Sequence, residues 1–331
     1  MPTTTLADIA ERAGISAAAV SLALNGKKGV SEETRARVLA IAKQSGYRIN
    51  RLGRALRQSR AGAVGLYLPE SAVHFGYYTE TTLGLTERLH EADLSLLIVP
   101  STPTSPRIES FPPVDGFILI EPHSDDEGAA MILAQDLPVV TGDSPPPGFP
   151  DPWGIVESPN TRTTREVLDR FVAHGSRQPG LLLVEQVSAW AQELEAAYRT
   201  WCAERRLEPQ VLLTTIHEEN GTLARRLAEW TAENGVDGVD AILVGADGVA
   251  VRVAGLLRTL GLRPGADIRL VSGVDSLIME FHTPPITSVD LQPREFGRAC
   301  GELLLELMEG DRPAETVRRG LDAVLRVRDS G

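Results

Sequence analysis

The residues best suited to chemistry in this chain are cationic and hydroxyl side chains that can hold a phosphate backbone, and they concentrate in the first sixty positions. That segment contains all three lysines and eight arginines against four acidic residues, a net charge of +7. Because the whole chain carries −12, the remaining residues carry −19. A basic head therefore precedes an acidic body. This asymmetry indicates a polyanionic partner for the head, while the body is repelled by phosphate.

Groups suited to catalysis or metal binding show no comparable pattern. The six histidines lack the paired spacing of metal ligands, and the chain contains neither a G-x-S-x-G elbow nor a G-x-x-x-x-G-K-[ST] loop. The GADGVA run at 245–250 fits a strand-to-helix turn better than a dinucleotide fingerprint. We therefore expect no catalytic residue, no metal and no cofactor, and a binding protein rather than an enzyme.

The length and the cysteine content narrow the class further. A chain of 331 residues is too long for one compact core and suggests two or three domains. Two cysteines, Cys202 and Cys300, cannot make a disulfide framework, which fits a reducing cytosol. We find neither a secretion signal nor an apolar run of about 18 residues, so we expect a cytoplasmic protein without a membrane span.

Three short helices are predicted within the basic head. Thr5 begins the first helix, and Asp8 three positions later completes a capping box. Gly14 closes this helix, Ser16 caps the second, and Ser31 caps the third. The second helix stops at 25–26 and the third at 46. Apolar residues at helical spacing form the expected buried faces: Leu6, Ile9, Ala10, Ala13, Val20, Ala23, Leu24, Val38, Leu39, Ile41 and Ala42.

The tight turn between the first two helices makes residues 1–48 a helix-turn-helix head, with a small three-helix packing module as the alternative. The next segment, 49–60, continues a series of arginines at every third position from Arg48 to Arg60. Such a helix is marginal in isolation, so we expect it to fold on contact with phosphate. A DNA-binding head followed by a basic segment that folds on contact with phosphate is therefore the favoured interpretation.

The body, 61–331, is predicted to be an α/β structure of two parallel-sheet lobes. Short apolar runs alternate with amphipathic stretches in two successive series, which indicates parallel sheets covered on both faces. The expected strands are 63–68, 94–99, 116–120, 137–142, 180–184, 211–214, 241–245 and 268–273. The expected helices lie near 78–92, 126–135, 160–174, 189–205, 219–234 and 247–261. A ligand is expected between the lobes, at the carboxyl ends of the strands.

Residues 5–57 resemble the head and hinge of the lactose/galactose repressor (LacI/GalR) family of transcriptional regulators. The shared motifs are V-S-x-x-x-N at 20–25, V-S-x-x-T-R at 30–35 and most of the hinge pattern Y-x-P-N-x-x-A-R-x-L at 47–56. Ile49 replaces the proline of the hinge pattern and Gly53 replaces its alanine. Both changes make the predicted hinge helix less stable.

The resemblance implies a DNA-contacting role for ten residues. It assigns phosphate contacts to Thr5, Ser16, Ser21 and Asn25, and base-reading positions to Ala17, Ala18 and Leu22. It places Lys28 in a loop that approaches DNA, and Arg54 and Leu56 in the hinge. Leu56 would wedge into the minor groove, or alternatively pack between paired hinges. The small apolar side chains of the second helix would contact thymine methyl groups, so recognition would rest on Lys28, the hinge arginines and DNA deformability.

The body is similar to the type I periplasmic sugar-binding proteins, the body of the same repressor family. The supporting runs are VDGFIL at 114–119, LPVV at 137–140, the segment 245–276 and PPITSVDLQPREFG at 284–297. The resemblance implies interleaved lobes. The first would comprise about 61–157 plus 289–316, and the second about 158–288 plus 317–331.

The same resemblance implies five effector-binding positions. These are Phe75, Trp190, Ile216, Asp247 and Asp275. Phe75 and Trp190 could equally be core residues, and the two aspartates could be helix caps or hydrogen-bond acceptors. An aromatic platform beside carboxylates is chemistry that suits a sugar or polyol.

Three departures bear on the effector. Glu193 or Leu194 stands where the family has an arginine, Ser176 interrupts its G-H-R motif, and Ser158-Pro159 replaces its D-N motif. These changes indicate a ligand that is not anchored as common sugar effectors are: a larger or cationic one, or none at all.

We therefore expect a homodimeric, sequence-specific regulator, a repressor of the bacterial nucleoid, that binds near-palindromic operator DNA under the control of a small molecule such as a sugar. The alternatives are a ligand-blind repressor, a solute-binding protein for import and a sugar-modifying enzyme. No leucine heptad follows Asp329, so a coiled-coil tetramer is not expected.

Overall fold

The chain forms two compact units in the computed structural model, Met1–Ala61 and Gly62–Gly331. The residues that the structure describes are 5–24, 28–45, 61–69, 72, 75–101, 113–184, 188–232 and 238–331. The predicted hinge, 49–60, therefore lies outside the described residues. A helical head and a two-sheet α/β body confirm the predicted fold class.

Three helices build the head: α1 (Leu6–Ala13), α2 (Ala17–Leu24) and α3 (Glu32–Gln44). Their shared core contains Ile9, Ala10, Ala13, Val20, Ala23, Val38 and Ala42. Leu39, which we expected in the core, is instead 48% exposed. Leu39 falls outside the buried stripe of α3, which Val38, Ile41 and Ala42 form.

The predicted helix caps of the head are confirmed. Thr5 and Asp8 form a reciprocal capping box at the start of α1, and Gly14 ends that helix in the left-handed conformation at φ 68°. The Ser31 hydroxyl accepts a hydrogen bond from the Thr34 N–H at 3.2 Å. Short helices with satisfied ends can pack on a small core, which is what a head of this size requires.

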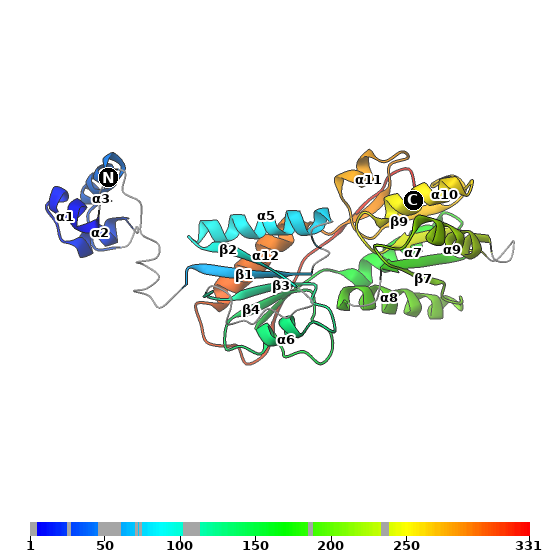
Figure 1. Ribbon diagram of the computed structural model, residues 1–331, viewed down its shortest axis with the longest axis horizontal. Helices are drawn as coiled ribbons and strands as arrows, with labels where there is room; N and C mark the ends of the chain where they lie inside the picture. Colours follow the sequence, from blue (N-terminus) through cyan, green and yellow to red (C-terminus); the bar gives the residue numbers. More distant parts are fainter. Residues whose placement is uncertain are drawn as a thin grey trace. The chain divides into compact units, whose positions relative to one another are not determined.

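The body contains two six-stranded sheets, one in each lobe (Figure 1). The first sheet is parallel throughout, in the order β11-β5-β4-β3-β1-β2. Its strands are β1 (Ala63–Leu68), β2 (Ser95–Pro100), β3 (Phe117–Ile120), β4 (Val139–Gly142), β5 (Gly154–Glu157) and β11 (Val317–Gly320). The helices α5 (Gly76–Glu91) and α12 (Pro293–Leu307) cover one face, and α6 (Glu127–Leu133) covers the other.

The second sheet has the order β12-β10-β9-β8-β6-β7, and only the β10–β12 pair is antiparallel. Its strands are β6 (Pro179–Val184), β7 (Val211–Thr214), β8 (Ala241–Val244), β9 (Arg269–Ser272), β10 (Thr287–Asp290) and β12 (Val324–Arg326). Helices α7 (Asn160–Ala173) and α8 (Ala189–Arg205) pack on one face. Helices α9 (Asn220–Ala232) and α10 (Val249–Thr259) pack on the other, and the short α11 (Leu277–Phe281) follows β9.

The chain passes between the lobes three times, and its last passage follows β11. We placed 317–331 in the second lobe, whereas β11 (Val317–Gly320) pairs with β5 of the first sheet and only β12 joins the second. Strand β5, which pairs with β11, is absent from the strands expected from the sequence. Its four residues follow a proline-rich stretch and include a glycine, so they lack the apolar run that marked the other strands.

Glycines let α5 and α12 approach closely. A Cβ at Gly84 would overlap the carbonyl oxygen of Arg294, and a Cβ at Gly297 would overlap the carbonyl oxygen of Thr81. Each helix thus places a glycine against the backbone of the other. The pair forms one layer over the first sheet.

We predict that Gly84→Ala lowers the free energy of unfolding of the body by about 2 kcal/mol or more, because the new methyl group displaces α12. Gly255→Ala is the matched control, since this helical glycine has no neighbouring atom within 4 Å of an added Cβ. That change should be neutral or stabilise by up to about 1 kcal/mol. Urea unfolding of both variants measures the difference, and equal effects would contradict the close packing of α5 on α12.

Candidate nucleic-acid interface and ligand site

The start of α2 forms the candidate DNA-reading surface. The Ser16 hydroxyl accepts a hydrogen bond from the Ala19 N–H at 3.2 Å and so caps the helix. Ala17 and Ala18 are exposed directly after this cap, while Ser21 and Leu22 are half-buried. The helix therefore presents a smooth surface of methyl groups, as the sequence indicated, with its buried side on Val20 and Ala23.

The other residues with a predicted DNA contact lie before and after α2 in the sequence. Lys28 is exposed in the turn before Gly29, whose position is packed against Leu22. Thr5 donates its N–H and its hydroxyl to Asp8 Oδ2, at 2.7 and 2.9 Å. These hydrogen bonds lower the pKa of Asp8, chiefly through the backbone N–H. Asn25, Arg54 and Leu56 lie outside the described residues.

In the body, the five predicted effector residues all follow strands, at the edges where the carboxyl ends of parallel strands lie. Phe75 is half-buried ahead of α5 and packs on the core of the first lobe. Trp190 is half-buried at the start of α8 and packs on the core of the second lobe. Ile216 lies in the turn after β7, where its carbonyl accepts a hydrogen bond from Arg252 at 3.4 Å. Both aromatic residues therefore contribute to cores, the alternative role that the sequence left open.

Asp247 joins the two lobes. It is 7% exposed, and its Oδ2 accepts a hydrogen bond from the Tyr77 N–H at 3.2 Å while its Oδ1 accepts from the Ser276 hydroxyl at 3.0 Å. Phe75, at the N-cap of α5, supplies no side-chain cap. The carboxylate of the second lobe therefore caps a helix of the first, although burial still raises its pKa.

Asp275 is occupied within the second lobe. Its Oδ1 accepts hydrogen bonds from the Ser288 hydroxyl and, at 2.8 Å, from Arg328 Nη1. The guanidinium neutralises the carboxylate and ties the C-terminal segment to the end of β9. The structure thus uses Asp275 as an internal brace.

Sequence reasoning missed two carboxylates that follow strands of the first lobe. Glu121 follows β3 and accepts a hydrogen bond from the Tyr78 hydroxyl, and Asp143 follows β4 and accepts one from the Ser158 N–H at 2.7 Å. Both have positive φ, at 51° and 59°. The available signal was their position immediately after an apolar run, the same signal that drew attention to Asp247.

Burial dominates the electrostatics of Asp143 and raises its pKa to about 7. The nearby carboxylates of Glu193, Glu121 and Glu157 raise the pKa further, while the Ser158 N–H opposes the shift. At neutral pH this carboxyl is therefore poised between its two protonation states.

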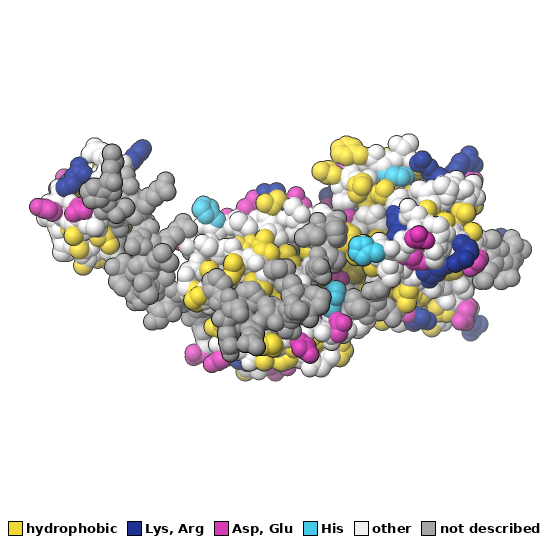
Figure 2. Space-filling view, in the orientation of Figure 1, with side chains coloured by type: hydrophobic (Ala, Val, Ile, Leu, Met, Phe, Trp, Pro, Cys, Tyr) yellow, Lys and Arg dark blue, Asp and Glu magenta, His cyan; other side chains and the backbone are white. Residues whose placement is uncertain are grey.

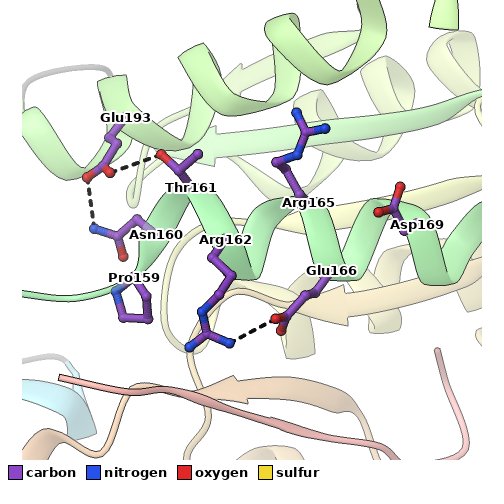
Figure 3. A pocket seen from close by; sticks show the side chains of 8 residues that line it. All are labelled: Pro159, Asn160, Thr161, Arg162, Arg165, Glu166, Asp169 and Glu193. Carbon is purple, nitrogen blue, oxygen red and sulfur yellow. Dashed lines mark hydrogen bonds and ion pairs between the residues drawn. The ribbon is translucent and has the colours of Figure 1, made fainter. Parts of the chain in front are cut away.

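A groove of about 550 Å³ runs along α7 on the second lobe (Figure 3). At one end Glu193 accepts hydrogen bonds from Asn160 Nδ2 at 3.0 Å and the Thr161 hydroxyl at 3.1 Å. Along the helix Arg162 pairs with Glu166, and Arg165 pairs with Glu204. The pairing of these arginines leaves the groove without a free cation among them.

No described helix combines the length and apolar character needed to cross a membrane. No three or more described His, Cys, Asp or Glu side chains are grouped so as to hold a metal ion.

A helix-turn-helix head on a two-lobed α/β body defines the class of ligand-controlled transcriptional regulators. Residues 5–50 match the model of bacterial regulatory proteins of the lacI family, and residues 168–331 match the periplasmic binding protein-like domain. The chain therefore combines a lacI-family head with a periplasmic binding protein-like domain, and it is similar to LacI/GalR-type regulators.

Its curated relatives match it along nearly the whole length. The transcriptional regulator CelR of Thermobifida fusca is 28% identical over 99% of this chain and 98% of its own. The sucrose operon repressor of Klebsiella pneumoniae is 29% identical over 98% of both chains. Among solved structures, a CelR–cellobiose complex matches with TM-score 0.73 at 26% identity, covering 99% of this chain and 100% of that chain. A Lac repressor dimer bound to operator and the anti-inducer ONPF shares the fold, with TM-score 0.78 at 22% identity and 99% coverage of both.

We predict that Asp143→Asn stabilises the body at about pH 8 and has little effect near pH 4. A carboxyl with a raised folded-state pKa stabilises the fold at low pH and loses that contribution as the pH rises towards 7, so its amide removes a cost paid only at high pH. Thermal unfolding at both pH values measures the effect, with the exposed Asp136→Asn as the control. A gain confined to low pH would contradict the raised pKa.

Proposed function

We propose that this protein is a sequence-specific DNA-binding regulator, a repressor, whose operator affinity is controlled by a small molecule held between its lobes. The observation that carries this proposal is a capped α2 with exposed alanines in a three-helix head that matches the lacI family, followed by a periplasmic binding protein-like body. Its activity is binding rather than catalysis. The proposal places the protein on DNA in the bacterial cytoplasm.

The proposed DNA contacts are those that the family resemblance implies, and the capped, exposed start of α2 supports them. Thr5 and Ser16 would hold phosphates at the N-terminal ends of α1 and α2, where helix dipoles favour anions, and Ser21 and Asn25 would hold phosphates further along the sequence. Ala17, Ala18 and Leu22 would contact base edges in the major groove, and Lys28 would supply a charge nearby. In the hinge, Arg54 would hold phosphate and Leu56 would enter the minor groove at the operator centre.

We predict that Ala18→Gln changes the preferred half-site, because a side-chain amide adds the bidentate hydrogen bonding that suits adenine. Selection from a randomised operator pool should show a new preference at one base pair, worth about 1–3 kcal/mol. Ala36→Gln, at an exposed position of α3, is the control and should leave the preference unchanged. An unaltered preference in Ala18→Gln would remove α2 from the bases.

We propose that the protein pairs with a second copy through α11. Leu277, Ile278 and Phe281 are 71%, 51% and 75% exposed, and apolar side chains gather over this short helix in the space-filling view (Figure 2). Exposed apolar side chains at this density mark interaction surfaces. The Lac repressor was solved as a dimer on its operator, and two heads would let this chain match a near-palindrome.

We predict that Phe281→Asp converts the dimer to a monomer and weakens operator binding by at least about tenfold, because one head then binds one half-site. Met131→Asp, on α6 and 44% exposed, is the matched control and should remain dimeric. Sedimentation equilibrium measures both. A dimeric Phe281→Asp variant would rule out α11 as the interface.

Ligand control would act through lobe closure. The lobes are joined by three chain passages and by the Asp247 cap on α5, so a molecule between them would alter the angle that these connections allow. A ligand that binds one arrangement better shifts the population competent to bind DNA. The CelR–cellobiose complex makes a sugar-like effector the first class to consider.

A ligand-blind repressor is the second candidate. Its specific support is that the carboxylates of Asp247 and Asp275 are both committed to the protein's own groups. The two candidates differ in one observable: compounds that leave operator affinity unchanged while the operator is still bound favour the ligand-blind protein.

A further inference from the structure

The carboxylates Asp143 and Glu193 are linked through a single short segment at the carboxyl end of β5. The Ser158 N–H donates to Asp143 at 2.7 Å, the Asn160 N–H donates to the Ser158 carbonyl at 2.9 Å, and Asn160 Nδ2 donates to Glu193 at 3.0 Å. One carboxylate follows a strand of the first lobe and the other belongs to α8 of the second. The segment 158–160 thus brings acidic groups of both lobes together.

The side chain at the centre of this segment has an unused polar atom. Ser158 is 8% exposed, and its Oγ has no hydrogen-bond partner among the described residues. Ser158 is two positions after Val156, which packs on the α5 and α12 face of the sheet. Ser158 follows the last residue of β5, and its N–H is bonded to Asp143, whose charge also influences Tyr77. A buried hydroxyl without a hydrogen-bond partner costs free energy unless a bound molecule supplies that partner.

The charge around this hydroxyl is not balanced by the protein's described residues. Among them, Arg318 pairs with Glu157, but no lysine or arginine forms an ion pair with Asp143, Glu121 or Glu193. The groups near Asp143 are the three carboxylates, the Tyr77 phenol of α5 and the Cys300 thiol of α12. Burial raises the pKa of Asp143 to about 7, and the negative charges of the neighbouring carboxylates add to that shift.

Aromatic rings complete the surroundings. Tyr77 and Tyr78 form an edge-to-face pair with ring centroids 5.4 Å apart, and the ring centroids of Phe75 and Tyr78 are 6.3 Å apart. Carboxylates beside aromatic faces are the chemistry that binds an ammonium group. A ligand with only a neutral hydroxyl could form a hydrogen bond with Ser158 Oγ, but it would leave the negative charge of Asp143 uncompensated.

We propose that the molecule bound between the lobes is a protonated amine on a small polar scaffold, whose ammonium group donates to Asp143, Glu193 and Ser158 Oγ. This inference rests on the proposed ligand control and specifies its chemistry. Cation binding requires the charged form of Asp143, so binding releases a proton and strengthens from about pH 6 to about pH 8.

The test is a thermal-shift and operator-binding experiment on the full chain with matched pairs of probes. D-glucosamine is compared with D-glucose and N-acetyl-D-glucosamine, and putrescine and spermidine are added as unrelated amines, all at equal ionic strength. We expect at least one amine to raise the melting temperature more than the neutral sugars do, and more at about pH 8 than at about pH 6. That amine should also change operator affinity.

Three variants locate the effect. Asp143→Asn and Glu193→Gln should reduce the affinity for that amine by about tenfold or more. Ser158→Ala should weaken it severalfold without lowering the stability of the free protein, because the hydroxyl has no partner there to lose. Glu204→Gln, on the same helix as Glu193 and paired with Arg165, should bind as the unaltered chain does.

Two results would overturn the inference: no amine stabilises the protein beyond the neutral sugars, or the stabilisation survives in both carboxylate variants. A neutral sugar that stabilises the protein and changes operator affinity overturns the amine while leaving ligand control in place. Stabilisation by an amine that never changes operator affinity supports the amine site and removes the ligand control.

Discussion

The body depends on one geometric constraint: parallel strands all end at the same edge of their sheet. The polar residues that follow β3, β4 and β8 therefore collect at strand ends, although they are far apart in sequence. The chain passes between the lobes three times, so three connections join the two sheets. Burial raises the pKa of Asp143 at this edge, and repulsion from the neighbouring carboxylates raises it further.

Helix α5 connects this edge to the rest of the first lobe. Its N-terminus receives Asp247 from the second lobe, and its body is pressed against α12 through Gly84 and Gly297. A change in the angle between the lobes therefore acts on α5 and α12, whose close packing permits little relative movement. Rigid packing of this kind favours movement of the lobe as a unit over local rearrangement.

Local signals in the sequence were enough to predict the head and most strands. Thr5, Asp8 and Gly14 define the ends of α1 because caps depend on neighbouring residues, and buried parallel strands appear as apolar runs. Non-local pairing was beyond that reach. Strand β5 is recognisable only with β11 beside it, and Arg328 neutralises Asp275 from 53 positions away. The sequence does not reveal that the hydroxyl of Ser158 is buried without a hydrogen-bond partner while its N–H is bonded to Asp143.

Two heads that read a near-palindrome as a pair would leave a symmetric footprint on DNA. Footprinting of the full chain on DNA fragments that carry its binding sites should show protection of two half-sites about one helical turn apart, with altered reactivity at the centre where a hinge would enter the minor groove. Protection without two-fold symmetry, or no protected site in any fragment, would contradict this paired reading.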